Sequence, residues 1–181
     1  MLGVDDAELI ARSVAEGRWF EPVFDRHYGR IHRFCVARAG PDAADDLASE
    51  TFVVAFRRRD AYDISHTDAA PWLYGIALNV LRAFHRRELA HGRLVNRARL
   101  ASASPSDGQL PYDRSGALST ALRGLSEQDR DLIVLFAWAG LTYEQLGECL
   151  GLPVGTVRSR LSRTRERLRR QLEPALAEGT M

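Results

Sequence analysis

Lysine is absent from this chain of 181 residues, and all 25 of its basic residues are arginine. Cysteine is nearly absent: Cys35 and Cys149 are too few for a disulfide framework, and zinc ribbons or fingers need more thiols or paired histidines. We therefore expect both cysteines to be buried as small apolar residues, and the chain to work in a reducing cytoplasm.

Long apolar runs and targeting segments are also missing. The longest apolar run, residues 132–140, is far shorter than the ~20 residues that a membrane-spanning helix needs. Residues 1–16 carry acids where a signal peptide needs basic residues, and no apolar segment follows them. We therefore expect neither secretion nor membrane insertion.

Patterns that carry catalysis or bind a cofactor are missing too. No glycine-rich phosphate loop follows a predicted strand, and no nucleophile stands beside a base at a useful spacing. His27, His32 and Cys35 come nearest to a set of metal ligands, but their spacing does not place them on one helical face. We expect no catalytic residue, no metal site and no cofactor.

Helical periodicity runs along nearly the whole chain. Apolar residues recur at spacings of three and four, which is typical of helices with one buried face. Gly40-Pro41 ends one such segment and Asp42 is placed to cap the next, whereas residues 60–70 lack periodicity and predict a loop. We predict helices at residues 5–15, 19–39, 42–58, 71–87, 127–139, 143–150 and 154–172.

A segment rich in Ser, Gly and Pro, residues 101–116, interrupts this pattern and is typical of a flexible linker. After it, Ser126 with Asp129 predicts a helix start, and Gly140 predicts a helix stop. The fold class predicted by the sequence is therefore all-α. Two helical modules, residues 1–100 and 117–175, are joined by the linker.

Opposite charges are segregated within a chain whose formal net charge is only +1. Residues 82–99 hold six arginines and one acid, and residues 153–170 hold seven arginines and one acid. Each of these basic segments follows an acidic one. Clustered arginine is the usual footprint of contact with phosphates, so we expect a nucleic-acid partner.

Residues 141–170 carry the most specific local pattern. Thr142 and Gln145 form a predicted capping box for a short helix, and Gly151 can adopt the left-handed conformation of a tight turn. Pro153 then favours the start of a long, arginine-rich second helix. These are the parts of a helix-turn-helix that reads a major groove. The alternative is a solvated helix with surplus arginine, which the agreement between turn chemistry and charge disfavours.

The second helix of such a motif supplies the contacts to DNA. Its N-terminal half meets base edges, where arginine can donate two hydrogen bonds to guanine and serine can bond to several bases. Other residues contact phosphates, which position the protein without reading sequence. The candidates for base contacts are Arg158, Ser159, Ser162 and Arg163. The candidates for phosphate contacts are Thr156, Arg160, Arg165 and Arg167.

Three strings extend the interpretation beyond the helix-turn-helix. They are Asp45-Asp46-Leu47-Ala48-Ser49-Glu50-Thr51-Phe52, Pro71-Trp72-Leu73-Tyr74-Gly75-Ile76-Ala77-Leu78-Asn79, and Gly155-Thr156-Val157-Arg158-Ser159-Arg160-Leu161. Together they closely resemble bacterial RNA polymerase sigma factors of the short extracytoplasmic-function (ECF) class in the sigma-70 family. The resemblance covers roughly residues 18–170 and places both modules in the expected order.

The resemblance implies that the first module is sigma region 2. Its acidic and apolar helix would dock on the clamp helices of the largest polymerase subunit, an arrangement that suits a basic partner surface. The helix from Pro71 to Arg87 would face the promoter minus-ten element, and Asn79 matches the promoter-reading asparagine of the family. The docking residues would be Asp45, Asp46, Leu47, Glu50 and Phe52. The residues beside the minus-ten phosphates would be Arg82, Arg86 and Arg87.

The loop Asp60–Asp68 would receive a base flipped out of the stack. Unstacking costs a few kcal/mol, and stacking on an aromatic side chain contributes ~1–3 kcal/mol in return. Tyr62, Trp72 and Tyr74 are the candidates for this stacking, and of these Trp72 and Tyr74 also fit the core face of the following helix. The second module would be sigma region 4 and would read the minus-thirty-five element as duplex.

The sequence thus predicts a transcription initiation factor that binds core RNA polymerase and promoter DNA and is not itself an enzyme. Family members are often held by an anti-sigma protein, which is a further candidate partner. The alternative is a stand-alone helix-turn-helix regulator, which would need a dimer surface that the sequence does not reveal. The linker departs from that of many relatives: Asp107 and Asp113 are its only acids, which argues against a strong mimic of the RNA backbone.

Overall fold

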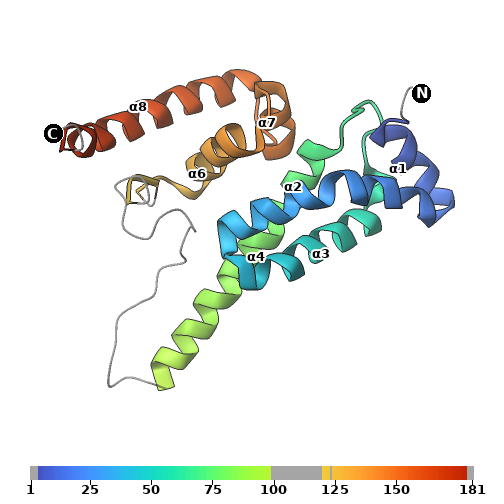
Figure 1. Cartoon of the computed structure of the whole chain (residues 1–181), viewed down its shortest axis with the longest axis horizontal. Helices are drawn as coiled ribbons and strands as arrows, with labels where there is room; N and C mark the ends of the chain where they lie inside the picture. The colour runs from blue at the N-terminus through green and yellow to red at the C-terminus, as the bar shows by residue number, and fades with distance from the viewer. Residues whose placement is uncertain (1–3, 99–119, 123, 179–181) are drawn as a thin grey trace. The chain divides into compact units, whose positions relative to one another are not determined.

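The computed structural model describes residues 4–98, 120–122 and 124–178, and every regular element within these ranges is helical (Figure 1). The N-terminal elements are α1 (Asp6–Ala15), η1 (Gly17–Phe20), α2 (Glu21–Ala39), α3 (Pro41–Arg57), η2 (Arg59–Ala61) and α4 (Ala70–Ala98). The C-terminal elements are α6 (Glu127–Val134), η3 (Leu135–Ala139), α7 (Tyr143–Leu150) and α8 (Val154–Glu178). The all-α prediction is confirmed, and the predicted linker at 101–116 falls outside the described residues.

The chain divides into two compact units. The first contains α1, η1, α2, α3, η2 and the part of α4 from Ile76 onward. The second contains residues 68–75 together with α6, η3, α7 and α8. Each unit buries apolar side chains of its own.

Helices α2 and α3 form the most extensive helix pair of the first unit. Gly40 alone separates them, with φ 87° and ψ 167°, a conformation open essentially only to glycine. The prediction that Gly40-Pro41 ends a helix is confirmed. The prediction that Asp42 caps the next helix is wrong, because Gly40 is the N-cap and no side chain caps α3. Pro41 starts the helix earlier, since its fixed φ suits the first helical position.

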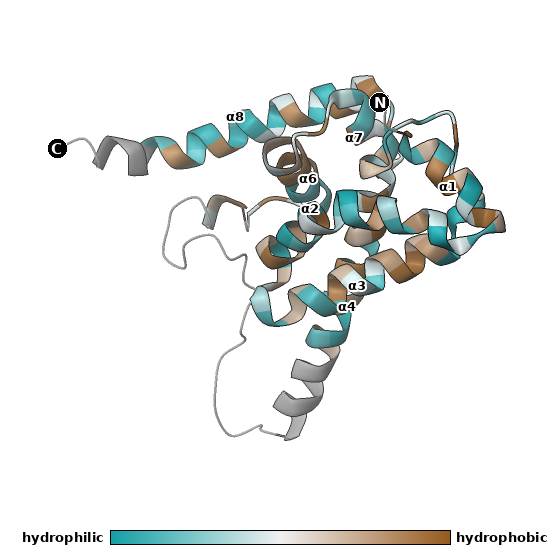
Figure 2. Cartoon of the chain, turned by 45° about the vertical axis from the view of Figure 1, so that its right-hand side comes forward, coloured by the Kyte–Doolittle hydropathy of each residue, from teal (hydrophilic) through white to brown (hydrophobic). Residues whose placement is uncertain are grey.

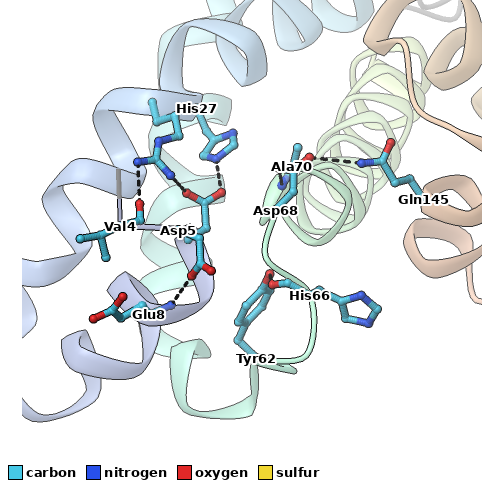
Figure 3. A network of polar contacts seen from close by, with 11 residues as sticks. Val4, Asp5, Glu8, His27, Tyr62, His66, Asp68, Ala70 and Gln145 are labelled. Atoms are coloured by element: carbon cyan, nitrogen blue, oxygen red, sulfur yellow. Dashed lines mark hydrogen bonds and ion pairs between the residues drawn. The ribbon is translucent and has the colours of Figure 1, made fainter. Parts of the chain in front are cut away.

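Helix α1 is attached to α2 through a buried carboxylate. The Asp5 side chain accepts a hydrogen bond from the Glu8 N–H (2.9 Å) and so caps the helix. Asp6 is buried, and its carboxylate contacts Nε2 of His27 at 2.6 Å and the guanidinium of Arg26 (Figure 3). His27, which the sequence offered only as a poor metal-ligand candidate, therefore has a structural carboxylate partner.

The segment between α3 and α4 is also tied to α1, at both of its ends. Nε of Arg59 donates to the Ser13 carbonyl (3.0 Å), and the Asp6 N–H donates to the Thr67 carbonyl (3.2 Å). The segment begins with the short 3₁₀ helix η2, which the sequence did not predict, and continues as the predicted loop. The loop between residues 59 and 67 is therefore attached to α1 at both ends.

The second unit is built around apolar residues from four consecutive elements. Ser126 caps α6 by accepting from the Asp129 N–H (3.2 Å), as predicted, and Gly140 ends η3 with φ 68°, as predicted. Residues 135–139 form a π-helical turn, which apolar periodicity alone does not reveal. The side chains buried deepest are Leu132, Leu135, Leu146, Val157 and Leu161.

Polar and apolar positions alternate around the helices rather than forming long apolar stretches (Figure 2). Within the ranges that the structure describes, no helix combines the length and the hydropathy needed to cross a lipid bilayer.

Cys35 offers a direct test of the core of the first unit. It is fully buried, and burial raises the pKa of its thiol to about 12. Cys149 is only half-buried, so the prediction of burial is confirmed for Cys35 and only in part for Cys149. We expect iodoacetamide at pH 8 to label Cys149 in the native chain and to spare Cys35, because only a thiolate reacts.

Peptide mass mapping measures this difference. In concentrated urea, where the core is lost, both cysteines are expected to react at similar rates. Equal labelling of the two cysteines in the native chain would contradict the packing around Cys35.

Candidate nucleic-acid interface

The helix-turn-helix is formed by α7, the turn at residues 151–153 and α8. Thr142 and Gln145 make the predicted capping box: the Thr142 hydroxyl accepts from the Gln145 N–H (3.2 Å), and the Gln145 side chain accepts from the Thr142 N–H (3.0 Å). Gly151 takes the predicted left-handed conformation, with φ 65°. Pro153 precedes the first residue of α8, as predicted.

Gly147 is essential for this turn, and no pattern in the sequence predicted its role. The Leu152 N–H donates to the Gly147 carbonyl (2.9 Å), so the turn folds back onto α7. A Cβ atom at position 147 would lie 2.8 Å from the Leu152 carbonyl oxygen, which is closer than real Cβ contacts allow. Only glycine fits where the two backbone segments meet.

Helix α8 has one buried face and one arginine-rich face. Val157, Leu161, Thr164 and Leu168 are buried at helical spacing. The predicted DNA contacts lie on the remaining surface, apart from Thr156 and Arg160, which are half-buried. The exposed ones are Arg158, Ser159, Ser162, Arg163, Arg165 and Arg167.

Three arginines of α8 lie beside the start of α6. Arg160 donates to Oε1 of Gln128 (2.8 Å), and Arg167 donates to the Gly124 carbonyl (2.8 Å). Together with Arg163 they line a polar hollow of about 310 Å³, which the Ser126 N-cap also faces. Arginine and helix N-termini both attract anions, so this hollow suits a DNA phosphate.

Two other arginines lie over aromatic rings. The guanidinium carbon of Arg158 lies 5.6 Å from the centre of the Tyr143 ring, and that of Arg165 lies 4.3 Å from the centre of the Phe136 ring. Arg158 is also 3.8 Å from Glu144. These contacts hold positive charge at two positions on the exposed face, where it can meet a polyanion.

The predicted minus-ten contacts of α4 share one exposed region. Asn79, Arg86 and Arg87 are exposed and Arg82 is half-buried. Asn79, Arg82 and Arg86 are spaced by three and four residues and thus follow one helix face. The structure thus places these four predicted residues close together on α4, with Asn79 nearest the start of the helix.

Tyr62 occupies a different place from the one expected of a stacking platform. Its ring is buried, with 8% of its surface exposed, and its hydroxyl donates to the His66 carbonyl (2.5 Å). Figure 3 shows Tyr62 pointing across the loop toward the backbone of His66. In this conformation Tyr62 supports the loop from within. Tyr74 is buried, as predicted for a core residue, whereas Trp72 is half-buried.

The loop between η2 and α4 has a defined internal structure. The His66 N–H donates to the Asp63 carbonyl (3.1 Å), and the Asp63 carboxylate accepts from the Ser65 N–H (3.0 Å). These hydrogen bonds from the Ser65 backbone and side chain hold the pKa of Asp63 below its usual value. Asp63 is therefore anionic at neutral pH and forms an ion pair with His66 (3.7 Å).

The acidic helix α3 separates the five predicted docking residues into two groups. Asp45, Asp46 and Glu50 are exposed and form one surface. Leu47 and Phe52 are only 4% exposed. The ring of Phe52 packs against rings of α2, so Leu47 and Phe52 belong to the core of the helix pair in the free chain.

Apolar side chains that the sequence analysis did not select lie beside these acids. Val53 and Phe56, on α3, and Phe24, on α2, are exposed large hydrophobic residues. Phe24 also packs on Tyr28, with ring centres 4.8 Å apart. Burial, the charge of Asp45 and a hydrogen bond to that carboxylate (3.3 Å) raise the pKa of Tyr28, which stays neutral. Helix α3 thus presents an acidic surface that continues into an apolar one.

Two family models match separate parts of this chain. The family model "Sigma-70 region 2" matches residues 23–90, and the model "Sigma-70, region 4" matches residues 121–170. The ECF RNA polymerase sigma factor SigW of Bacillus subtilis is 31% identical over 166 residues, which cover 84% of this chain and 88% of SigW. The chain belongs to the ECF sigma factors of the sigma-70 family.

Further relatives place this sigma factor within the same class. SigM of Mycobacterium tuberculosis is 32% identical over 173 residues, which cover 92% of this chain and 84% of SigM. SigE of Mycolicibacterium smegmatis is 35% identical over 153 residues, which cover 80% of this chain and 58% of SigE.

Solved structures of sigma factors share the fold. CnrH, solved in complex with the cytosolic domain of CnrY, has a TM-score of 0.63 and 25% identity, with 97% of this chain and 99% of CnrH covered. RpoE of Bartonella quintana, solved in complex with the anti-sigma factor NepR, has a TM-score of 0.59 and 25% identity. The match covers 85% of this chain and 96% of RpoE.

The sigma factor is a transcription initiation factor that directs RNA polymerase to promoters. Region 2 spans α2, α3 and most of α4, and region 4 spans α6, η3, α7 and most of α8. The stand-alone helix-turn-helix regulator is not favoured, since both sigma regions match in one chain. Helix α1 lies before the matched part of region 2, so the resemblance does not explain its contacts.

Proposed function

We propose that this sigma factor divides promoter recognition between its two units. Region 4 would lay α8 in the major groove of the minus-thirty-five element, while region 2 would hold core polymerase and open the minus-ten element. The observation that carries this proposal is the presence of both sigma regions, in this order, on one chain. The polymerase would perform all covalent chemistry, and the sigma factor would act in the cytoplasm beside it.

The arginines of α8 support the minus-thirty-five assignment. Arg158 and Arg163 lie on the exposed face within the N-terminal half of α8, where base edges are read. Arg160, Arg165 and Arg167 are held by Gln128, Phe136 and Gly124 respectively, and such fixed cations suit phosphates. Thr156, Ser159 and Ser162 complete the contact surface.

Helix α4 and the preceding loop support the minus-ten assignment. Asn79 would read a base, and Arg82, Arg86 and Arg87 would contact the backbone of the same strand. Because the Tyr62 ring is buried, stacking of a flipped base on Tyr62 would need the loop to open. The exposed residues of the loop are better placed to meet DNA first.

Helix α3 supports docking on the clamp helices of the polymerase largest subunit. Asp45, Asp46 and Glu50 would meet a basic surface, and Val53 and Phe56 would extend the contact with apolar area. Leu47 and Phe52 would act indirectly, since their packing against α2 shapes the docking helix.

An anti-sigma protein is the second proposed partner. RpoE of Bartonella quintana was solved with an anti-sigma factor, and CnrH with the cytosolic domain of CnrY. The exposed apolar residues of α2 and α3 are a surface that such a protein could cover, in competition with polymerase.

Association with core polymerase tests the proposal. We expect the tagged chain to retain purified core enzyme on an affinity resin, and excess untagged chain to compete. Resin carrying an unrelated helix-turn-helix protein is the control. A chain that retains no more core enzyme than this control would contradict the proposal.

Arg158 and Arg163 provide a test of minus-thirty-five reading. We expect Arg158→Ala or Arg163→Ala to reduce discrimination between matched and mismatched upstream elements by ~1–3 kcal/mol, the value of one bidentate base contact. The measurement is transcription by holoenzyme from promoters that differ only in that element.

Arg169→Ala is the matched control, because Arg169 is exposed on α8 and pairs with Glu173 (3.3 Å) well beyond the N-terminal half. We expect this variant to keep full discrimination. Equal loss on matched and mismatched promoters for Arg158→Ala and Arg163→Ala would show phosphate contacts instead of base contacts.

A further inference from the structure

Ile64 is an unusually exposed apolar side chain in region 2. It is 63% exposed, more than any other large hydrophobic residue among those that the structure describes. It lies at the tip of the loop between η2 and α4, in the turn closed by the hydrogen bond from the His66 N–H to the Asp63 carbonyl (3.1 Å). A single exposed isoleucine is unremarkable on a helix, but here the loop directs it outward.

The loop that carries Ile64 is held in place from inside. Tyr62 donates to the His66 carbonyl (2.5 Å), and Asp63 accepts from the Ser65 N–H (3.0 Å) and pairs with His66 (3.7 Å). The residues on either side of Ile64 thus form hydrogen bonds with one another within the turn. Asp63, Ser65 and Thr67 are exposed as well, and Ile64 is the exposed large apolar side chain among them.

Helix α1 holds the same loop from outside. Arg59 is bonded to the Ser13 carbonyl, and Thr67 accepts from the Asp6 N–H, so one helix fixes both ends. Asp6 is itself buried against His27. A loop supported in this way is already ordered in the folded protein. It therefore loses little conformational entropy when it binds a partner.

The position of Ile64 relative to α4 suits single-stranded DNA. The basic face of α4 begins a few residues after the loop, and at 1.5 Å per residue the distance along the helix from Ala70 to Arg86 is about 24 Å. A strand of several nucleotides could follow the arginines and reach the loop. Proteins that open or kink DNA use isoleucine among other apolar wedges beside unstacked bases.

We propose that Ile64 is a wedge that enters the base stack at the minus-ten element and keeps its two strands apart. The inference rests on the proposed role of region 2 in opening promoters. Ile64 would contribute apolar contact to the face of an unstacked base, while Asn79 reads sequence and the arginines of α4 hold the backbone. The loop would need no aromatic platform for this task.

Transcription from two templates tests the wedge. One promoter is fully duplex, and the other is the same promoter with the minus-ten strands mismatched and therefore already open. We expect Ile64→Ser to lower run-off transcription at least tenfold on the duplex and less than twofold on the open template. Ile64→Leu, which keeps the apolar volume, is expected to retain most of the duplex activity.

Val14→Ser is the matched control, since Val14 is an exposed branched residue on α1, outside the loop. It is expected to behave as the unaltered chain on both templates. Fluorescence of 2-aminopurine at the minus-ten element reports opening directly and should fail to rise with Ile64→Ser. We expect Ile64→Ser to retain core polymerase as well as the unaltered chain does.

Two results would overturn the wedge. Equal loss by Ile64→Ser on both templates would place Ile64 in base reading or in polymerase contact, and unchanged duplex activity would leave it without a role. Either result would leave the proposed function intact, provided that the unaltered chain transcribes both templates. Failure of the unaltered chain on both would instead refute the proposed function itself.

Discussion

Reversing two charges on α3 is expected to weaken binding to core RNA polymerase by at least about tenfold, because like charges facing each other at an interface cost several kcal/mol. Asp46 and Glu50 are exposed and lie one helical turn apart, so Asp46→Arg with Glu50→Arg places two positive charges on one surface. Neither side chain belongs to the core. The helix pair should therefore survive, and circular dichroism should remain unchanged. Titration of labelled core enzyme measures the dissociation constant.

The control carries the same change of net charge elsewhere in the first unit. Glu16→Arg with Asp25→Arg alters two exposed acids that lie outside α3. We expect this variant to bind core polymerase within about threefold of the unaltered chain, since distant charges act mainly through screened, long-range fields. Similar weakening by both double variants would indicate a general charge effect and would remove the docking role from α3.

Removing the Asp6 carboxylate is expected to destabilise the first unit by about 3 kcal/mol. Asp6 and His27 are both buried and lie 2.6 Å apart, and breaking such a pair from one side leaves a buried polar group without its partner. Asp6→Ala should also loosen α1 and the loop that α1 holds. Hydrogen exchange of peptides from α1 and residues 59–67 measures this opening locally, which suits a chain of two units.

Glu8→Ala is the matched control on the same helix. Glu8 is exposed and pairs with Arg12, and a surface pair of this kind contributes at most about 1 kcal/mol. We expect its exchange pattern to stay close to that of the unaltered chain. If Asp6→Ala exchanged no faster than Glu8→Ala, the buried contact would not be what attaches α1.

The features that the sequence predicted well depend on neighbours along the chain. The capping box of Thr142, the N-cap of Ser126 and the turn at Gly151 each follow from residues within a few positions of one another. Helix periodicity is local in the same sense. These signals therefore identified the all-α fold and the helix-turn-helix before any tertiary contact was known.

The features that the sequence missed depend on contacts between distant segments. Leu47 and Phe52 belong to a string that resembles the docking helix, but their burial is decided by α2. Tyr62 has the chemistry of a stacking platform, yet its hydroxyl is bonded within the loop. Gly147 is required only because the turn after α7 folds back on it.

The contacts of α1 show the same limit more strongly. Nothing in the pattern of residues 5–15 indicates that this helix fixes both ends of a loop some fifty residues later, because that depends on how α1 packs in three dimensions. In the sequence, Asp6 is one of several acids near the N-terminus and has no obvious partner. The structure shows that it contacts His27. The outward direction of Ile64 depends on the same contacts, since they hold the loop that carries it.

Transcription from genomic fragments tests the central claim most directly. Purified core polymerase, which lacks a sigma factor of its own, is incubated with fragments of DNA from the source organism, with and without this chain, and the 5′ ends of the RNA are sequenced. We predict discrete start sites that appear only with the chain and share two sequence elements, near minus ten and minus thirty-five. RNA ends that are the same with and without the chain would contradict the account.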